Sequence, residues 1–227
     1  MSNLSKLYAQ LRECSPANLQ VSLLAATKGR TVDEINQYVD DFRKIIDPAF
    51  QSKTIIGESY VQEMLEKRPL LRGVDEVHFI GRIQSNKIPQ LVKDVAVLHS
   101  VGREKLLKGI ETEVRRQGAL PQKLYLQVNI SDDTAKDGFQ PDEVGDVVEY
   151  VRGCDALELS GLMTITRLYD EPEDSFDDYC RLVELGRQCG VHSFSMGMSG
   201  DYQVAIRAGV RVGATSIVLR IGSLLFG

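Results

Sequence analysis

The stretch V-S-L-L-A-A-T-K, from Val21 to Lys28, is apolar almost to its end. A short apolar run of this kind predicts a strand that is buried on both faces, as in a parallel sheet. A helical pattern follows at once, because Thr31 and Glu34 have the spacing of a capping box that opens a helix over Thr31–Lys44. A strand followed by a helix is the repeating unit of α/β folds.

The same alternation continues along the chain. Eight strand–helix units in 227 residues favour an α/β fold of one closed (β/α)8 barrel, the TIM type, over an open doubly wound sheet. The turn A-A-T-K-G-R also lacks the G-x-G-x-x-G pattern of dinucleotide folds. The seven further strands are expected at Thr54–Gly57, Val77–Gly81, Val95–Val101, Lys123–Ile130, Leu157–Ile165, His192–Met196 and Ser216–Ile221.

Composition sets the domain organisation and excludes several classes of protein. No linker or repeat divides the chain, so we expect a single domain over residues 1–227 with no second β-domain. A net charge of −5 gives no general attraction for nucleic acid. The N-terminus predicts an amphipathic helix, with Leu4, Leu7 and Leu11 on one face, and no stretch has the length of a membrane span. We therefore expect a cytoplasmic protein with neither nucleic acid nor membrane as partner.

The four cysteines predict neither a disulfide framework nor a metal site. None belongs to a C-x-x-C pair, and no histidine stands at ligand spacing beside one. Buried or helix-surface thiols are the simpler interpretation.

Lys28 is the first candidate for chemistry. It ends the first strand, and the functional face of a barrel lies at the carboxyl ends of its strands. Most lysines are solvated surface charges. A lysine amine that is removed from water can instead form a Schiff base with a carbonyl compound.

The far end of the chain supplies a partner for this lysine. The loop S-M-G-M-S-G-D-Y (Ser195–Tyr202) follows strand seven, and we expect it to open a short helix at Ser199; R-I-G-S (Arg220–Ser223) closes strand eight, which lies beside strand one in a closed barrel. Phosphate sites in barrels are often formed by these two loops, whose small residues let N–H groups approach an anion. The loop alone would be interpreted as an ordinary turn. Together with Lys28, it matches pyridoxal 5′-phosphate.

Six segments with these and other polar residues occur in an order that resembles one known family. They are similar to the pyridoxal-phosphate-binding homeostasis proteins of the YggS/PROSC type, which are related to the barrel domain of alanine racemase. The resemblance runs from near Lys28 to the last residue. The segments are A-A-T-K, G-E-S-Y-V-Q-E (57–63), H-F-I-G-R-I-Q-S-N-K (78–87), G-L-M-T-I (161–165), S-M-G-M-S-G-D-Y (195–202) and R-I-G-S-L-L-F-G (220–227).

The resemblance implies a fold-type III barrel that holds pyridoxal 5′-phosphate as a Schiff base on Lys28. By the same resemblance, Ser199 and the backbone of Gly222 and Ser223 bind the phosphate, and Arg220 faces the pyridine nitrogen. The further cofactor contacts that it implies are Met198, Ser59, His78 and Met163. For His78 a core histidine is an equal alternative, and for Met163 core packing is the default.

Three positions depart from the family pattern. Ser59 stands where the family has an asparagine near the cofactor, and Gly102 stands where it has a carboxylate. Lys28 is followed by Gly29-Arg30 rather than by threonine and a basic residue. The contacts around Lys28 are therefore expected to be altered.

The resemblance favours a carrier that binds pyridoxal phosphate for cofactor and amino-acid homeostasis, with pyridoxal-phosphate-dependent enzymes as recipients. The alternative is a racemase-like enzyme of weak activity. Racemisation needs an acid or base on each face of Cα, and in alanine racemase a tyrosine from a second domain supplies one; Tyr60 and Tyr202 are more easily explained by packing. A class I aldolase that uses Lys28 is the third hypothesis. We assign no catalytic residue and expect a monomer or a weak homodimer.

Overall fold

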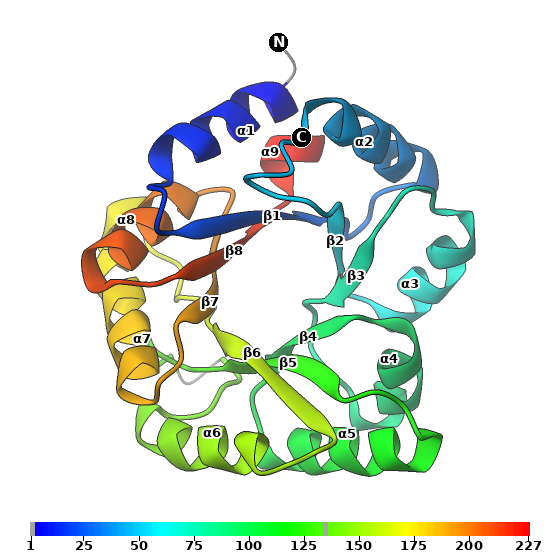
Figure 1. Ribbon diagram of the computed structural model, residues 1–227, viewed down its shortest axis with the longest axis vertical. Helices are drawn as coiled ribbons and strands as arrows, with labels where there is room; N and C mark the ends of the chain where they lie inside the picture. Colours follow the sequence, from blue (N-terminus) through cyan, green and yellow to red (C-terminus); the bar gives the residue numbers. More distant parts are fainter. Residues whose placement is uncertain (1–2, 134–135) are drawn as a thin grey trace.

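The computed structural model describes residues 3–133 and 136–227. Its eight strands run parallel and close into one barrel in sequence order, with β8 paired to β1 (Figure 1). The expected α/β fold and its closed (β/α)8 barrel are confirmed. The strands are β1 (Gln20–Ala26), β2 (Ile55–Glu58), β3 (Glu76–Phe79), β4 (Val97–Val101), β5 (Gln122–Gln127), β6 (Leu157–Met163), β7 (Ser193–Met198) and β8 (Ser216–Ile221).

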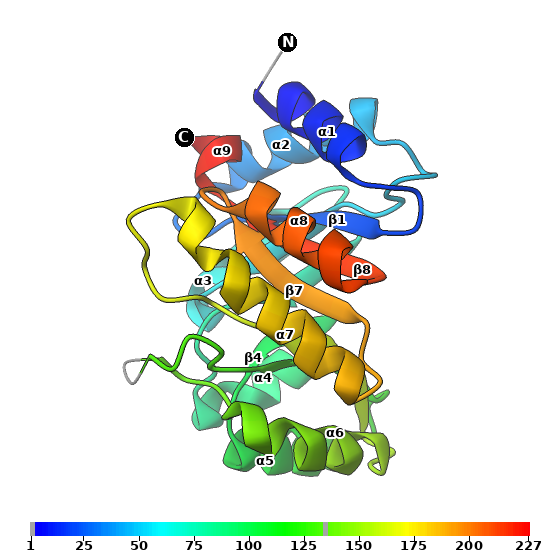
Figure 2. The same cartoon turned by 90° about the vertical axis from the view of Figure 1, so that its left-hand side faces the viewer.

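Helices surround the barrel and cover its outer face. Figure 2 shows α7 and α8 lying over the outside of the barrel beside β7 and β8. The helices are α1 (Asn3–Cys14), α2 (Val32–Ile45), α3 (Val61–Lys67), α4 (Ile88–Asp94), α5 (Glu104–Gln117), α6 (Val144–Arg152), α7 (Phe176–Gln188), α8 (Tyr202–Val212) and α9 (Ser223–Phe226). Short 3-10 turns lie at Arg68–Leu70, Ser85–Lys87, Pro141–Glu143 and Pro172–Ser175.

The start of α2 follows the capping box that its sequence predicts. The Thr31 hydroxyl accepts a hydrogen bond from the Glu34 N–H at 3.2 Å, and the Glu34 carboxylate accepts one from the Thr31 N–H at 2.7 Å. These two bonds satisfy donors that a helix start leaves without partners. The N-terminal helix α1 is confirmed as well, with Leu4, Leu7 and Leu11 buried.

The apolar residues of the barrel divide into two layers. The larger layer lies between strands and helices, where the helix faces bury their apolar stripes. The smaller layer fills the barrel interior, because alternate strand residues point inward. Its members are Leu24, Ile55, Val97, Tyr125, Met163 and Val218. The barrel interior is therefore filled by side chains. A ligand can bind only at the end of the barrel, and in this fold the functional end is the one where the strands have their carboxyl ends.

The helix expected to open at Ser199 begins later. Ser199 and Gly200 form a turn, and α8 starts at Tyr202 with Asp201 as its N-cap residue. The Asp201 carboxylate accepts a hydrogen bond from the Met198 N–H at 2.7 Å, which closes the turn before the helix can start. Ser199 therefore belongs to a loop and not to a helix N-terminus.

Within the described ranges 3–133 and 136–227, no helix has the length and apolar character that spanning a membrane requires. The same residues include no cluster of histidine, cysteine and acidic side chains able to hold a metal ion. All four cysteines are free thiols.

Candidate functional site

The carboxyl ends of β1, β7 and β8 meet at one side of the barrel mouth. Leu24 of β1 lies opposite Arg220 of β8, and Met198 of β7 lies opposite Arg220 from the other side. The residues that follow these strands, including Lys28 and Gly222, therefore gather at the same end of the barrel.

Lys28 lies exposed in the turn after β1. Its Nζ atom is 5.2 Å from the centroid of the Tyr60 ring, a cation–π contact that leaves the amine accessible. Among the residues that the structure describes, no carboxylate is within ion-pair distance of this amine. Lys28 thus presents an amine at the mouth without an acidic partner to bind it.

The backbone on both sides of Lys28 is held by α3. The Lys67 ammonium donates to the Thr27 carbonyl at 3.1 Å, and the Gly29 N–H donates to the Glu63 carboxylate at 2.9 Å. Glu63 and Lys67 also pair with each other across one helical turn. The backbone on both sides of Lys28 is therefore fixed by hydrogen bonds, while its side chain contacts only the Tyr60 ring among the contacts described above.

A buried carboxylate supports the same turn from below. Glu58, at the end of β2, accepts a hydrogen bond from the Thr27 hydroxyl at 2.7 Å and lies 3.6 Å from the Lys67 ammonium. Burial raises the pKa of Glu58, against the Thr27 hydroxyl and the Lys67 charge, which lower it. These two contacts stabilise a carboxylate that burial alone would disfavour.

The loops after β7 and β8 meet at Ser199. Its hydroxyl oxygen accepts hydrogen bonds from the N–H of Gly222 at 3.2 Å and from the N–H of Leu224 at 3.5 Å. Two N–H groups that converge on one oxygen form a small anion-binding concavity. An oxygen of a phosphate ester could take up the same donors.

Arg220 is a buried cation with neutral partners. Its guanidinium donates to the Ser195 hydroxyl and to the Thr164 carbonyl, each at 2.7 Å, and only 6% of the residue is exposed. No carboxylate of the described residues forms an ion pair with it. Burial lowers the pKa of Arg220, although an arginine stays charged in a protein. A hydrogen-bond acceptor on a bound ligand would stabilise this buried charge further.

The remaining candidates separate into two groups. Met198 is partly exposed at the end of β7, Ser223 is exposed at the start of α9, and Ser59 is half-buried in the turn after β2. The structure therefore brings Met198 and Ser223 to the mouth together with Lys28, Ser199, Arg220 and Gly222, and places Ser59 on the neighbouring turn. His78 and Met163 lie deeper: Met163 belongs to the inner core, and both ring nitrogens of His78 have side-chain partners.

Of the candidate residues, Met198 lines a cavity of about 290 Å³ together with Thr166 and Asp201. A cavity of about 220 Å³ opens over the β3–β6 side of the inner core, and Ile80, Gln127 and Ile165 form part of its wall.

The sequence interpretation missed the anchoring pair of Glu63 and Lys67 and the buried His99. The pair had a visible signal, because its members stand four residues apart in a helical segment. His99 stands two residues after Val97, whose side chain lies in the inner core, so strand alternation could have placed it inside the barrel.

Two of the departures from the family pattern have a structural reason. A Cβ atom at Gly102 would lie 2.9 Å from the Cα atom of Gly138, so the loop after β5 excludes a side chain there. Gly29 has φ +70°, which glycine adopts without strain.

The fold and the mouth residues define a barrel of the alanine racemase type. The family model described as the alanine racemase N-terminal domain matches residues 48–227. The pyridoxal phosphate homeostasis protein of Aquifex aeolicus is 34% identical over 180 residues, 76% of each chain. That of Pseudomonas aeruginosa is 33% identical over 99% of this chain and 94% of its own. The chain therefore belongs to the family of pyridoxal phosphate homeostasis proteins, as the ordered segments had indicated.

A solved structure extends the similarity to three dimensions. PipY of Synechococcus elongatus PCC7942 with pyridoxal phosphate (PLP) bound is 27% identical, with a TM-score of 0.73 over 98% of this chain and 99% of its own. The same protein without PLP gives a TM-score of 0.78.

Proposed function

We propose that this protein binds pyridoxal 5′-phosphate through a Schiff base with Lys28 and serves in the homeostasis of this vitamin B6 cofactor and of amino acids. The observation that carries the proposal is the meeting of three groups at one mouth. They are an accessible lysine amine, a buried arginine that no carboxylate of the described residues pairs with, and the converging N–H groups of Gly222 and Leu224. The relatives named as homeostasis proteins and the PLP-bound PipY support it.

The residues at the mouth have distinct roles in this proposal. The Ser199 hydroxyl and the N–H groups of Gly222 and Ser223 would bind the phosphate, and Met198 and Ser59 would lie near the ring. Arg220 would face the pyridine nitrogen. Because arginine keeps its protons, it can only donate to that nitrogen, which stays unprotonated. When bound, the cofactor supplies a reactive carbonyl and an electron sink that an unprotonated ring nitrogen weakens.

This set of roles favours a carrier over an efficient enzyme. We propose that PLP-dependent enzymes of the cytoplasm receive the cofactor, and that the protein acts as a monomer or a weak homodimer. Four free thiols are typical of a reducing compartment. A single functional domain over residues 1–227 stays a prediction.

Weak racemase-like activity is the second candidate, and one observation favours it. Tyr60 is 53% exposed and contacts the Lys28 amine, whereas Tyr202 is buried and packs as expected. The prediction that Tyr60 is a packing residue is therefore wrong, because its ring is exposed and contacts the Lys28 amine. A tyrosine hydroxyl and a lysine amine can each act as a general acid or base, and racemisation needs one such group on each face of Cα.

The first experiment compares the absorption spectra of wild type, Lys28→Ala and Lys105→Ala after reconstitution with PLP. We expect a visible band in wild type and in Lys105→Ala, a control at an exposed lysine of α5, and its loss in Lys28→Ala. Borohydride reduction followed by peptide mapping should locate the cofactor on Lys28.

The opposite results have clear meanings. A wild-type protein that stays colourless after reconstitution would refute the proposal and favour the aldolase hypothesis. If the band is present, assays of amino-acid turnover with wild type and Tyr60→Phe separate the carrier from the racemase-like enzyme.

A further inference from the structure

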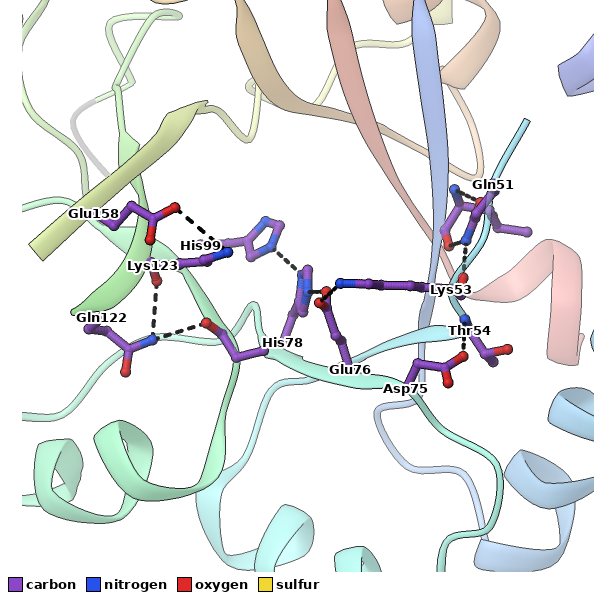
Figure 3. A network of polar contacts seen from close by, with 12 residues as sticks. Gln51, Lys53, Thr54, Asp75, Glu76, His78, His99, Gln122, Lys123 and Glu158 are labelled. Atoms are coloured by element: carbon purple, nitrogen blue, oxygen red, sulfur yellow. Dashed lines mark hydrogen bonds and ion pairs between the residues drawn. The ribbon is translucent and has the colours of Figure 1, made fainter. Parts of the chain in front are cut away.

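A line of polar side chains crosses the barrel interior from the amino ends of the strands to Arg220. Figure 3 shows its lower part, from Lys53 through Glu76 and His78 to His99. The Lys53 ammonium lies 2.5 Å from one Glu76 oxygen, and the other oxygen lies 3.0 Å from His78 Nε2. His78 Nδ1 lies 2.9 Å from His99 Nε2.

The upper part reaches the proposed cofactor site. His99 Nδ1 lies 2.7 Å from the Ser195 hydroxyl, which accepts a hydrogen bond from Arg220 at 2.7 Å. His99 and Ser195 are fully buried, and the His99 ring stacks on Tyr125 with centroids 4.5 Å apart. Water therefore cannot supply the partners that these polar atoms need.

His99 is held in its neutral form. Burial is the main cause that lowers the pKa of His99 well below its ordinary value, and the charge of the nearby Arg220 acts in the same direction. A neutral imidazole has one donor nitrogen and one acceptor nitrogen. The tautomer therefore decides to which neighbour the ring donates a hydrogen bond and from which it accepts one.

The two ends of the line fix its direction. Arg220 can only donate, and the Glu76 carboxylate can only accept. At a pH where both imidazoles are neutral, every contact is a hydrogen bond in one arrangement only: Ser195 donates to His99 Nδ1, His99 Nε2–H donates to His78 Nδ1, and His78 Nε2–H donates to Glu76. The reverse arrangement would place two acceptors, His78 Nε2 and the Glu76 oxygen, 3.0 Å apart.

We propose that His78 and His99 are positioning residues, which Glu76 locks as Nε2–H tautomers so that the Ser195 hydroxyl holds Arg220 at the cofactor site. The role toward the cofactor rests on the proposed function, whereas the tautomers do not. The Asp201 carboxylate also acts on Arg220 through its charge, without an ion pair between them. A carboxylate at the opposite end of the barrel thereby orients the arginine at the mouth.

The first test uses the protein without cofactor. Only three histidines occur in the chain, and His192 is exposed, which makes it an internal reference. In protein labelled with 15N-histidine, long-range 1H–15N spectra at mildly alkaline pH should show His78 and His99 as single Nε2–H tautomers. An Nδ1–H tautomer at either residue, or an average of both tautomers, would overturn the proposal.

The second test removes the Glu76 carboxylate, which lies at the opposite end of the barrel from Arg220. We expect Glu76→Ala to leave both buried histidines as tautomer mixtures and to shift the visible band of the PLP-loaded protein. Glu158→Ala is the matched control: its carboxylate forms an exposed ion pair with Lys123, 3.6 Å away at the same end of the barrel, and should change neither signal.

The outcomes are distinguishable. A Glu76→Ala protein with unchanged tautomers or an unmoved band would overturn the positioning role. If that variant does not fold, the wild-type tautomers decide. A wild type that binds no PLP would refute the proposed function. The 1H–15N spectra of the protein without cofactor would still test whether Glu76 fixes the two tautomers.

Discussion

Single residues at the mouth differ in what their surroundings allow them to do. Lys28 and Arg220 carry the same charge, yet one is exposed and the other buried. An exposed amine can reach a carbonyl compound, whereas a buried guanidinium can only hold a ligand through donated hydrogen bonds. The two cations therefore have separate tasks in the proposed site.

Ser199→Ala tests whether the Ser199 hydroxyl binds the phosphate of PLP. The loss of one hydroxyl that hydrogen-bonds a charged group should weaken PLP retention about ten- to a hundredfold, since such bonds contribute roughly 1.5–3 kcal/mol. Dialysis of the loaded protein, followed by absorption, measures retention. Ser223→Ala should retain the cofactor as wild type does, because only the backbone of Ser223 is proposed to bind. Equal retention in both variants would remove Ser199 from the site.

At the scale of elements, the turn after β1 depends on a neighbouring helix. Thr27 and Gly29 are bonded to Lys67 and Glu63 of α3, so the position of Lys28 is set by a helix that follows the next strand. This arrangement is possible because consecutive β/α units lie side by side in a barrel.

Gly29→Ala tests whether this turn must keep its shape. Gly29 has φ +70° and no heavy atom within 4 Å of an added Cβ, so the variant suffers backbone strain alone, about 1 kcal/mol. Gly118→Ala has the same surroundings at φ +60° but lies at the end of α5. Both variants should lose similar stability in urea unfolding, and only Gly29→Ala should bind PLP more weakly. Equal binding would mean that the turn tolerates displacement.

At the scale of the whole molecule, the barrel is joined through its interior as well as through its sheet. The buried line from Glu76 to Arg220 links β3, β4, β7 and β8 by side chains, in addition to the backbone pairing of neighbouring strands. Loss of charge at one end should therefore affect the stability of the entire fold.

Glu76→Gln should lower this stability in a pH-dependent way. The hydrogen bond from His78, together with the hydrogen bond and charge of Lys53, lowers the pKa of Glu76 from 4.5 to about 2 against the opposing effect of burial. A depressed carboxyl pKa stabilises the fold above the unfolded value and stops doing so as pH falls through the folded value. The variant should thus be less stable at neutral pH by at most about 3 kcal/mol, and by less to the extent that water screens this partly exposed carboxylate. The difference should vanish toward pH 2. Urea unfolding across this range measures it; a constant difference would contradict the expected linkage.

Much of the fold could be predicted from the sequence. The apolar run Val21–Thr27 predicts a strand, and Thr31 with Glu34 predicts a helix start, because both signals depend on neighbours in the chain. The ordered motifs also determined the family and pointed to Lys28 and Ser199.

Only the tertiary structure decided how these residues are held. The hydroxyl of Ser199 meets the N–H of Gly222, and His99 meets Ser195, because barrel closure brings distant strands together. It also decided that α8 begins at Tyr202, through the Asp201 side chain, and that His78 lies below the mouth. Contacts between residues far apart in sequence depend on strand register and side-chain burial, which no local pattern contains.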